Sequence, residues 1–380
     1  MDYNVISADT HLDLTWLPGD MFIQAAPDGI KDKMPHVRET DKGKRWIIEG
    51  EDIARAGGFS EYVPGEYHHL DRMAEAGFYS GVQEGIYRPA VAELRIEDQD
   101  RDQVNAEVIY GILGIAGGGF SGPGFKDPKV TTAIYDVYNE WIADFVKAHP
   151  QRLGGLACVV SHDPQIAARQ VRRAAEIGLK GAEINVGKTT KPIYHQDWDP
   201  LWAAAAECHI PISFHTLGLN YRAPDPSELK DYRYIDLGLS FILFQLSGAE
   251  FVASITLSGA CENHPDFQFV LGECGIGWLP YVLERTDVEY DDRLFHLGLK
   301  LKPTEYWRRQ GYSTFQQEYV SMDEIDRIGV DNIMWGSDYP HPDGVYPDSQ
   351  KVIQEGMGHL PEDVRRKIVC DNAARLYSFN

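Results

Sequence analysis

Three short apolar segments of this chain each run into side chains that commonly bind metal ions. Residues 4–8 are followed by Asp9 and His11, residues 210–214 by His215, and residues 332–337 by Asp338. Positions two apart in an extended segment share a face, so Asp9 and His11 point to the same side of the backbone. Imidazoles and carboxylates that converge from distant parts of a chain form a metal site or an acid–base site.

Other apolar runs end in further candidate site residues. We predict as metal ligands Asp9, His11, Glu183, His215, Glu273 and Asp338, and as catalytic residues Asp338, His341 and His162. In this assignment Asp338 serves both as a ligand and as the general base. His341 and His162 contact substrate or orient a ligand.

Each candidate also has an ordinary structural interpretation. His215 fits a buried core imidazole, and Asp338 fits a turn before a Pro-rich loop. Glu183 fits an ion pair with Lys188 or Arg172. These alternatives stay open at the level of sequence.

Two further assignments are equally open. Glu273 fits a cap of the helix that follows it. Asp13 could replace Asp9 as the partner of His11, because the patterns HxD and DxH are equivalent in spacing. The tandem pair His68 and His69 is typical of a solvated helix start.

The elements that must position these residues alternate regularly along the chain. Eight apolar runs, separated by segments of helical periodicity, predict strands at 4–8, 106–110, 153–160, 180–184, 210–214, 267–271, 312–315 and 332–335. This rhythm predicts an α/β fold, a (β/α)8 TIM barrel over 1–380 as a single domain. In such a barrel the residue just past each strand faces the active-site mouth.

A long insertion follows the first strand. We expect residues 17–100 to form a cap over the mouth, because 17–66 are rich in Gly, Pro and charge. Within it, the alternation from Lys44 to Glu49 indicates a hairpin. The Gly-rich loop 117–122 lacks a phosphate-binding fingerprint and is predicted to be a lid. Substrate specificity is expected to lie in these segments and in 217–234.

The formal net charge of -22 argues against nucleic acid or an anionic membrane as a partner, so we expect a small-molecule substrate. The five cysteines are widely spaced without a CxxC pair, which argues against a disulfide framework. With no signal-like start or long apolar run, these features predict a cytoplasmic protein. The apolar helices around 240–255 predict a homodimer.

Four motifs together resemble the amidohydrolase superfamily. They are Asp-Thr-His at 9–11, Pro-Ile-Ser-Phe-His at 211–215, the block Gly-Glu-Cys-Gly-Ile-Gly-Trp-Leu-Pro-Tyr-Val-Leu-Glu-Arg at 272–285, and Trp-Gly-Ser-Asp-Tyr-Pro-His at 335–341. The most similar branch contains aminocarboxymuconate-semialdehyde decarboxylase and the γ-resorcylate-type decarboxylases. The resemblance implies a distorted TIM barrel and a divalent metal held by Asp9, His11, His215 and Asp338.

The sequence departs from that family in two places. Members commonly have HxH after the first strand and a histidine after the sixth, where this chain has Asp9-x-His11 and Glu273. The first change is mild, because a Glu-x-His pair serves some decarboxylases of the branch. The second replaces the residue that usually polarises substrate or moves a proton.

Three functions fit these residues. The first is a metal-dependent hydrolase or decarboxylase acting on a small carboxylate-bearing or cyclic organic substrate, with Zn, Mn or Fe as the divalent metal. The second is a non-haem di-iron monooxygenase, because four carboxylates and two imidazoles suit two Fe ions. The third is a non-catalytic binding protein on an inherited barrel.

Overall fold

The structure is a computed structural model that describes residues 3–58, 62–113, 127–215 and 233–379. The predicted lid at 117–122 lies outside the described residues, as does almost all of the predicted specificity segment 217–234.

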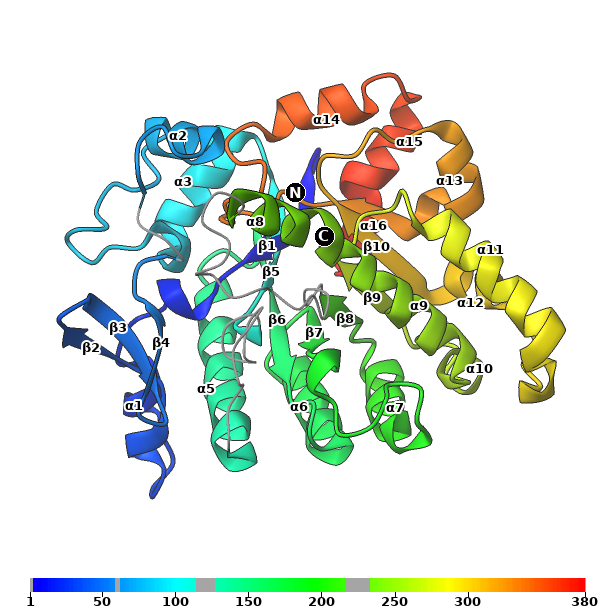
Figure 1. The fold of residues 1–380 in the computed structure, drawn as a ribbon, viewed down its shortest axis with the longest axis horizontal. Coiled ribbons are helices and arrows are strands. Elements are labelled where there is room, and N and C mark those ends of the chain that lie inside the picture. Colours follow the sequence, from blue (N-terminus) through cyan, green and yellow to red (C-terminus); the bar gives the residue numbers. More distant parts are fainter. Residues whose placement is uncertain (1–2, 59–61, 114–126, 216–232, 380) are drawn as a thin grey trace.

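Eight parallel strands form the barrel, in the order β1-β5-β6-β7-β8-β9-β10-β11 (Figure 1). Their bounds are β1 Ile6–His11, β5 Ala106–Tyr110, β6 Leu153–Val159, β7 Gly181–Ile184, β8 Ile212–His215, β9 Phe269–Gly272, β10 Gly311–Phe315 and β11 Ile333–Trp335. Almost every strand residue is buried, as expected for strands covered by helices outside and packed side chains inside. The predicted (β/α)8 fold and all eight predicted strands are confirmed.

The first and last strands meet just beyond their paired regions. The backbone N–H of His11 donates to the carbonyl of Tyr339, and that of Asp338 donates to the carbonyl of Asp9 over 2.9 Å. This junction brings the two ends of the sequence together, so the residues after β1 and after β11 lie side by side.

Helices surround the barrel (Figure 1). They are α3 Ala92–Asp102, α5 Pro128–Val146, α6 Pro164–Glu176, α7 Asp199–Cys208, α8 Arg233–Leu243, α9 Gly248–Leu257, α10 Ala260–Asn263, α11 Leu279–Glu289, α12 Pro303–Gln310, α13 Met322–Ile328, α14 Ser349–Met357, α15 Glu362–Arg366 and α16 Asn372–Leu376. Pro at the first turn and a capping Asp begin both α5 and α6, where Asp127 and Asp163 accept backbone N–H bonds. No helix in the described part of the chain is long and apolar enough to cross a membrane.

The segment after β1 carries the short helix α1 Met21–Gln24, a small antiparallel sheet and the helix α2 His68–Glu75. The sheet has three strands, β2 His36–Thr40, β3 Gly43–Ile48 and β4 Glu51–Arg55. The predicted hairpin over Lys44–Glu49 is therefore wrong in detail, because this stretch is mostly the central strand, β3, paired on both edges. Figure 1 shows this sheet at one side of the barrel.

Candidate metal centre

The side chains that end β1 and β8 and follow β11 converge on one point. The Nε2 atom of His11 lies 3.3 Å from Asp9 Oδ1, 3.2 Å from Asp338 Oδ1 and 3.1 Å from His215 Nε2. The Nε2 atom of His215 is itself 3.7 Å from Asp9 Oδ1. Two imidazoles and two carboxylates from three distant segments thus surround a common centre, as the strand-end positions predict.

Glu273 borders the same centre from β9. Its Oε2 lies 3.5 Å from His215 Nε2, and its Oε1 accepts a hydrogen bond from Gln316 Nε2 over 3.2 Å. Burial and the nearby charge of Asp338 raise the pKa of Glu273 well above its usual value. Glu273 does not cap α11, whose N-cap residue is Trp278.

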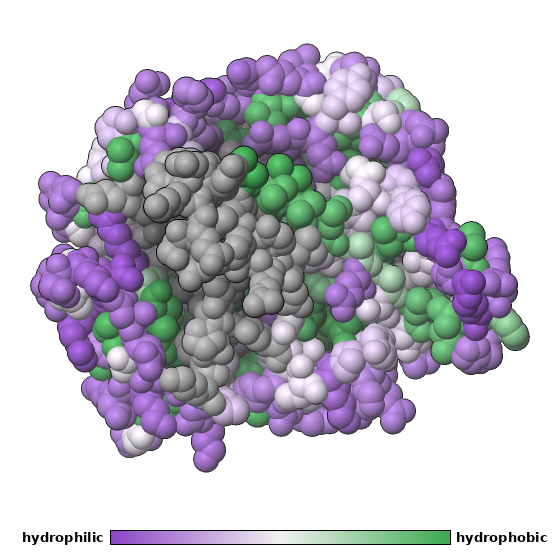
Figure 2. Space-filling model, viewed as in Figure 1, coloured by the Kyte–Doolittle hydropathy of each residue, from purple (hydrophilic) through white to green (hydrophobic). Residues whose placement is uncertain are grey.

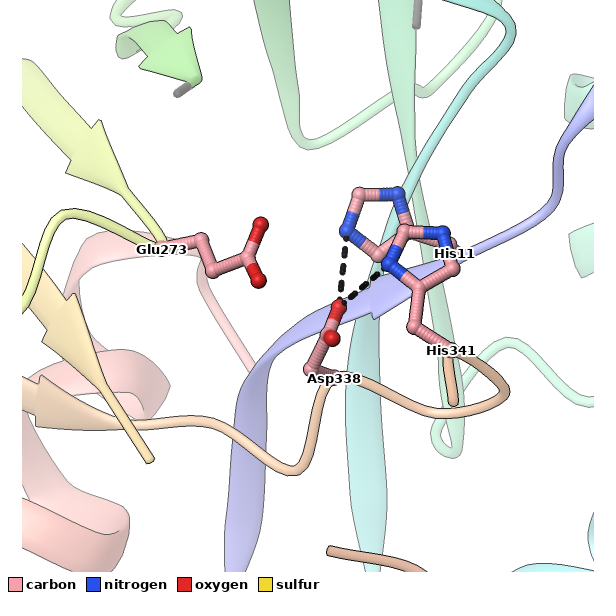
Figure 3. A group of neighbouring side chains, drawn as sticks. All are labelled: His11, Glu273, Asp338 and His341. Carbon is pink, nitrogen blue, oxygen red and sulfur yellow. Dashed lines mark ion pairs between the residues drawn. The ribbon is translucent and has the colours of Figure 1, made fainter. Parts of the chain in front are cut away.

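His341 links the centre to Asp13. Its Nδ1 lies 2.9 Å from Asp338 Oδ1, and its Nε2 lies 3.0 Å from Asp13 Oδ2. Asp13 is therefore the partner of His341, whereas Asp9 is the nearby carboxylate of His11. Figure 3 shows His11 and His341 side by side above Asp338, with Glu273 facing them across the centre.

These side chains form two overlapping groups in which the possible ligand atoms lie within 4.8 Å of one another. One group contains Asp9, His11 and His215, and the other contains His11, Glu273, Asp338 and His341. Both groups include His11. The geometry is therefore that of one compact site and not of two separated ones.

The donor set fits a cation. Asp9 Oδ1 and both carboxylate oxygens of Asp338 are buried and accept no hydrogen bond of good geometry, although imidazole nitrogens lie nearby. Burying carboxylates without compensation is unfavourable, so this arrangement favours a bound positive charge. Carboxylate oxygen and imidazole nitrogen together are the ligands expected for Zn, Mn or Fe.

The carboxylates around His11 favour the protonated form of its imidazole. Burial and the charge of His341 lower the pKa of His11, but the close contacts of its ring with the carboxylates of Asp338 and Asp9 outweigh both and raise it to about 9. Burial raises the pKa of Asp9, and the close contacts with the imidazoles of His11 and His215 overcome that effect and lower it. A metal ion must therefore displace a proton from His11.

Close packing between β1 and the turn after β11 fixes Asp9. Thr314 Oγ1 donates to Asp9 Oδ2 over 2.7 Å. Gly336 lies against Asp9, and a Cβ atom at Gly336 would come within 2.5 Å of the Asp9 Cβ. Only a residue without a side chain lets the two segments approach this closely.

The helix α3, which lies in the range predicted as the insertion, carries a buried polar face that joins the two ligand-bearing segments. Arg95 is fully buried, donates to the His11 carbonyl over 2.9 Å and to Thr10 Oγ1 over 3.0 Å, and forms an ion pair with Glu107 of β5. The guanidinium therefore holds the end of β1 in place through the backbone of His11.

Two acids on the same face of α3 bind the segment after Asp338. Asp98 accepts hydrogen bonds from Tyr339 Oη over 2.8 Å and Tyr346 Oη over 3.0 Å. Asp102 accepts from the Ser349 backbone N–H over 2.9 Å and from its hydroxyl group. Because α3 contacts both ligand-bearing segments, it sets their relative position.

Two predicted site residues lie outside the two groups of possible ligands. Glu183 is buried in the barrel, where its Oε1 accepts from the Gly111 N–H over 2.5 Å and from Cys158 Sγ over 3.4 Å. Its alternative partner Arg172 instead pairs with Glu207 on the surface. The Nε2 atom of His162 lies 3.3 Å from Thr132 Oγ1 on α5. Neither Glu183 nor His162 belongs to the two groups of possible ligands.

The structure also reveals residues that sequence reasoning missed. Arg95 and Asp98 occupy a helix that reads as an ordinary charged surface helix, so no local signal marks them. The prediction of a solvated helix start is wrong for His69, because its Nε2 is enclosed by protein while the adjacent His68 is exposed. In the sequence, only the tandem pair His68 and His69 drew attention to His69.

The chain is similar to known proteins in sequence. The family model described as amidohydrolase matches residues 114–379. A γ-resorcylate decarboxylase from Polaromonas sp. is 27% identical over 260 residues, which cover 64% of this chain and 75% of that protein.

Solved structures show the same fold. An amidohydrolase from Mycobacterium avium subsp. paratuberculosis superposes with a TM-score of 0.73 at 20% identity, covering 99% of this chain and 100% of the other. A dihydroxybenzoic acid decarboxylase from Polaromonas sp., solved with bound manganese and the inhibitor 2-nitroresorcinol, gives a TM-score of 0.64 at 18% identity and covers 100% and 98%.

Proposed function

This chain belongs to the amidohydrolase family of metal-dependent hydrolases and lyases, and we propose that it decarboxylates a small hydroxylated aromatic carboxylate. The observation that carries the proposal is the convergence of Asp9, His11, His215 and Asp338 at the barrel mouth. The decarboxylase relative supplies the reaction class, and its name says that the relative itself acts on γ-resorcylate.

The four converging residues would hold a divalent metal, and manganese is favoured because a structurally similar decarboxylase contains it. When bound, such an ion withdraws electron density from the substrate carboxylate as a Lewis acid. Glu273 follows β9, and its carboxyl group lies beside His215 at the edge of the site.

The remaining chemistry is the movement of a proton. In decarboxylation the bond between ring carbon and carboxylate breaks, CO2 leaves, and the ring carbon takes a proton in its place. Asp338, the predicted general base, would accept a proton from His341 and pass it to the ring carbon; the two nitrogens of His341 lie next to Asp338 and Asp13. Asp13 and His341 thus form a buried path for a proton that leads to Asp338.

The di-iron alternative is not supported. The relatives found are decarboxylases and amidohydrolases, not oxygenases. Glu183, the fourth carboxylate that the alternative needs, is bound to Gly111 and Cys158. The site therefore offers one cluster of ligands.

The experiment is to strip the purified protein of metal, reload it with Mn2+, and supply 2,6-dihydroxybenzoate and a panel of other hydroxylated benzoates. CO2 release with formation of the corresponding phenol is expected. Asp338→Asn should lower turnover by about 100-fold or more, since it removes the proton-transfer group. Asp144→Asn, which changes an exposed carboxylate on α5, should retain turnover. No CO2 from any benzoate with metal bound, or full activity of Asp338→Asn, contradicts the proposal.

Pairing of two copies of the chain is part of the proposal. Large apolar side chains stand exposed along α8 and the turn that follows it, namely Ile235, Leu239, Phe241, Ile242 and Leu246. Figure 2 shows hydrophobic residues gathered on this face. Such a patch favours a contact between copies, as predicted. The cytoplasmic setting also stays a prediction; in agreement with it, all five cysteines are free.

A further inference from the structure

His69 has an enclosed ring nitrogen without a function in the fold. Its Nε2 is buried and has no hydrogen-bond partner among the described residues, although the residue as a whole is only partly buried. A buried polar group in that state is unfavourable by about 1–3 kcal/mol, and most such groups in folded proteins are paired. The missing partner therefore calls for an explanation beyond stability.

The helix that carries His69 is fastened to the segment after Asp338. Arg72 of α2 forms an ion pair with Asp348, at the start of α14. Phe78, just past α2, packs against Tyr339 with ring centroids 5.8 Å apart. Figure 1 shows α2 close to the segment leading into α14. The helix therefore has a fixed position relative to the metal centre.

The electrostatics place His69 within reach of that centre. Burial and the charge of Arg72 lower the pKa of His69, while the Asp338 carboxylate raises it, with lowering as the net result. The carboxylate of Asp338, a proposed metal ligand, therefore lies close enough to His69 to affect its pKa. The adjacent His68 is exposed.

We infer that His69 is a substrate-binding residue whose Nε2 forms a hydrogen bond with a ring hydroxyl of the aromatic carboxylate. A phenolic hydroxyl both donates and accepts, so it satisfies Nε2 in either neutral tautomer.

This inference deepens the proposed function and rests on it for the substrate class. The test is equilibrium binding to the manganese-loaded protein, with resorcinol as the hydroxyl-bearing probe and benzoate as the probe without hydroxyls. His69→Phe keeps the ring shape and removes Nε2, so it should weaken resorcinol binding about 10-fold and leave the binding of benzoate and Mn2+ unchanged. His69→Gln, which retains a polar group, should recover part of the loss.

His68→Phe is the matched control and should bind both probes like the wild type. Equal resorcinol binding by wild type and His69→Phe, or an equal loss of resorcinol, benzoate and Mn2+ binding, overturns the role of His69. Because binding is measured without turnover, the two proposals fail separately. A wild type that binds resorcinol through His69 but releases no CO2 refutes only the reaction, whereas turnover that is unchanged in His69→Phe refutes only the hydroxyl contact.

Discussion

Replacing Gly336 with alanine is expected to disrupt metal binding without changing any proposed ligand. The added Cβ would lie 2.5 Å from the Asp9 Cβ and 3.1 Å from the Asp9 backbone nitrogen. Ordinary van der Waals contact begins at 3.4 Å, so the segments must separate by about 0.9 Å. Neither can move freely, because the Gly336 N–H donates to Phe315 and the Asp338 N–H donates to Asp9.

The size of the effect follows from that displacement. Overpacking a rigid interior by one methyl group destabilises the fold by about 1–3 kcal/mol. Metal–ligand distances tolerate only about 0.2 Å of error, so a shift several times larger removes Asp9 or Asp338 from the coordination sphere. We expect Mn2+ affinity to fall by about 10- to 100-fold or more, comparable to the loss of a group that orients a ligand.

Calorimetric titration of Mn2+ into the metal-free protein, together with urea unfolding, measures both quantities. Gly238→Ala is the control, since a Cβ there meets nothing within 4 Å and alanine favours the helix α8. Gly238→Ala should bind Mn2+ like the wild type and unfold at equal or higher urea. If Gly336→Ala also binds Mn2+ with unchanged affinity, Asp9 is not a ligand whose position depends on this contact, and the reasoning fails.

Three further outcomes follow from buried charges. Burial raises the pKa of Asp102 from 3.8 to about 7, so the proton it binds stabilises the fold at low pH, an effect lost as pH rises through 7. In urea unfolding between pH 4 and 8, Asp102→Asn should remove up to about 4 kcal/mol of the decline in the free energy of unfolding with pH. An equal dependence on pH in the wild type and the variant would contradict this. Mn2+ binding at pH 7.5 should release a proton, because the pKa of His11 is about 9 without metal. Calorimetry in buffers of different ionisation enthalpy detects this proton. Equal apparent heats in these buffers would count against His11 as a ligand. Arg95→Met leaves Glu107 buried without its ion pair and should destabilise the metal-free protein by about 3–5 kcal/mol. Arg173→Met, on the surface, should change the unfolding free energy by less than about 1 kcal/mol. Similar losses in both variants would refute the structural role of the buried pair between Arg95 and Glu107.

The barrel and the core of its site were predictable from local patterns. A strand buried on both sides reads as an unbroken apolar run, and such a run ends at His215 and another leads into Asp338. Parallel strands of one barrel all end at the same face, so strand-end residues meet however far apart they lie in the chain. The convergence of Asp9, His11, His215 and Asp338 follows from those two facts.

Only the tertiary structure decided which polar side chains are buried and which hydrogen-bond or ion-pair partners they have. Asp98 and Arg95 resemble solvated helix residues in sequence, yet Asp98 is bound by Tyr339, 241 residues away, and Arg95 by the His11 carbonyl. The pairing of His341 with Asp13 and the enclosure of His69 are equally non-local. Hydrophobic periodicity is a property of neighbouring residues in the sequence, whereas the partner of a buried charge is determined only when distant segments pack together.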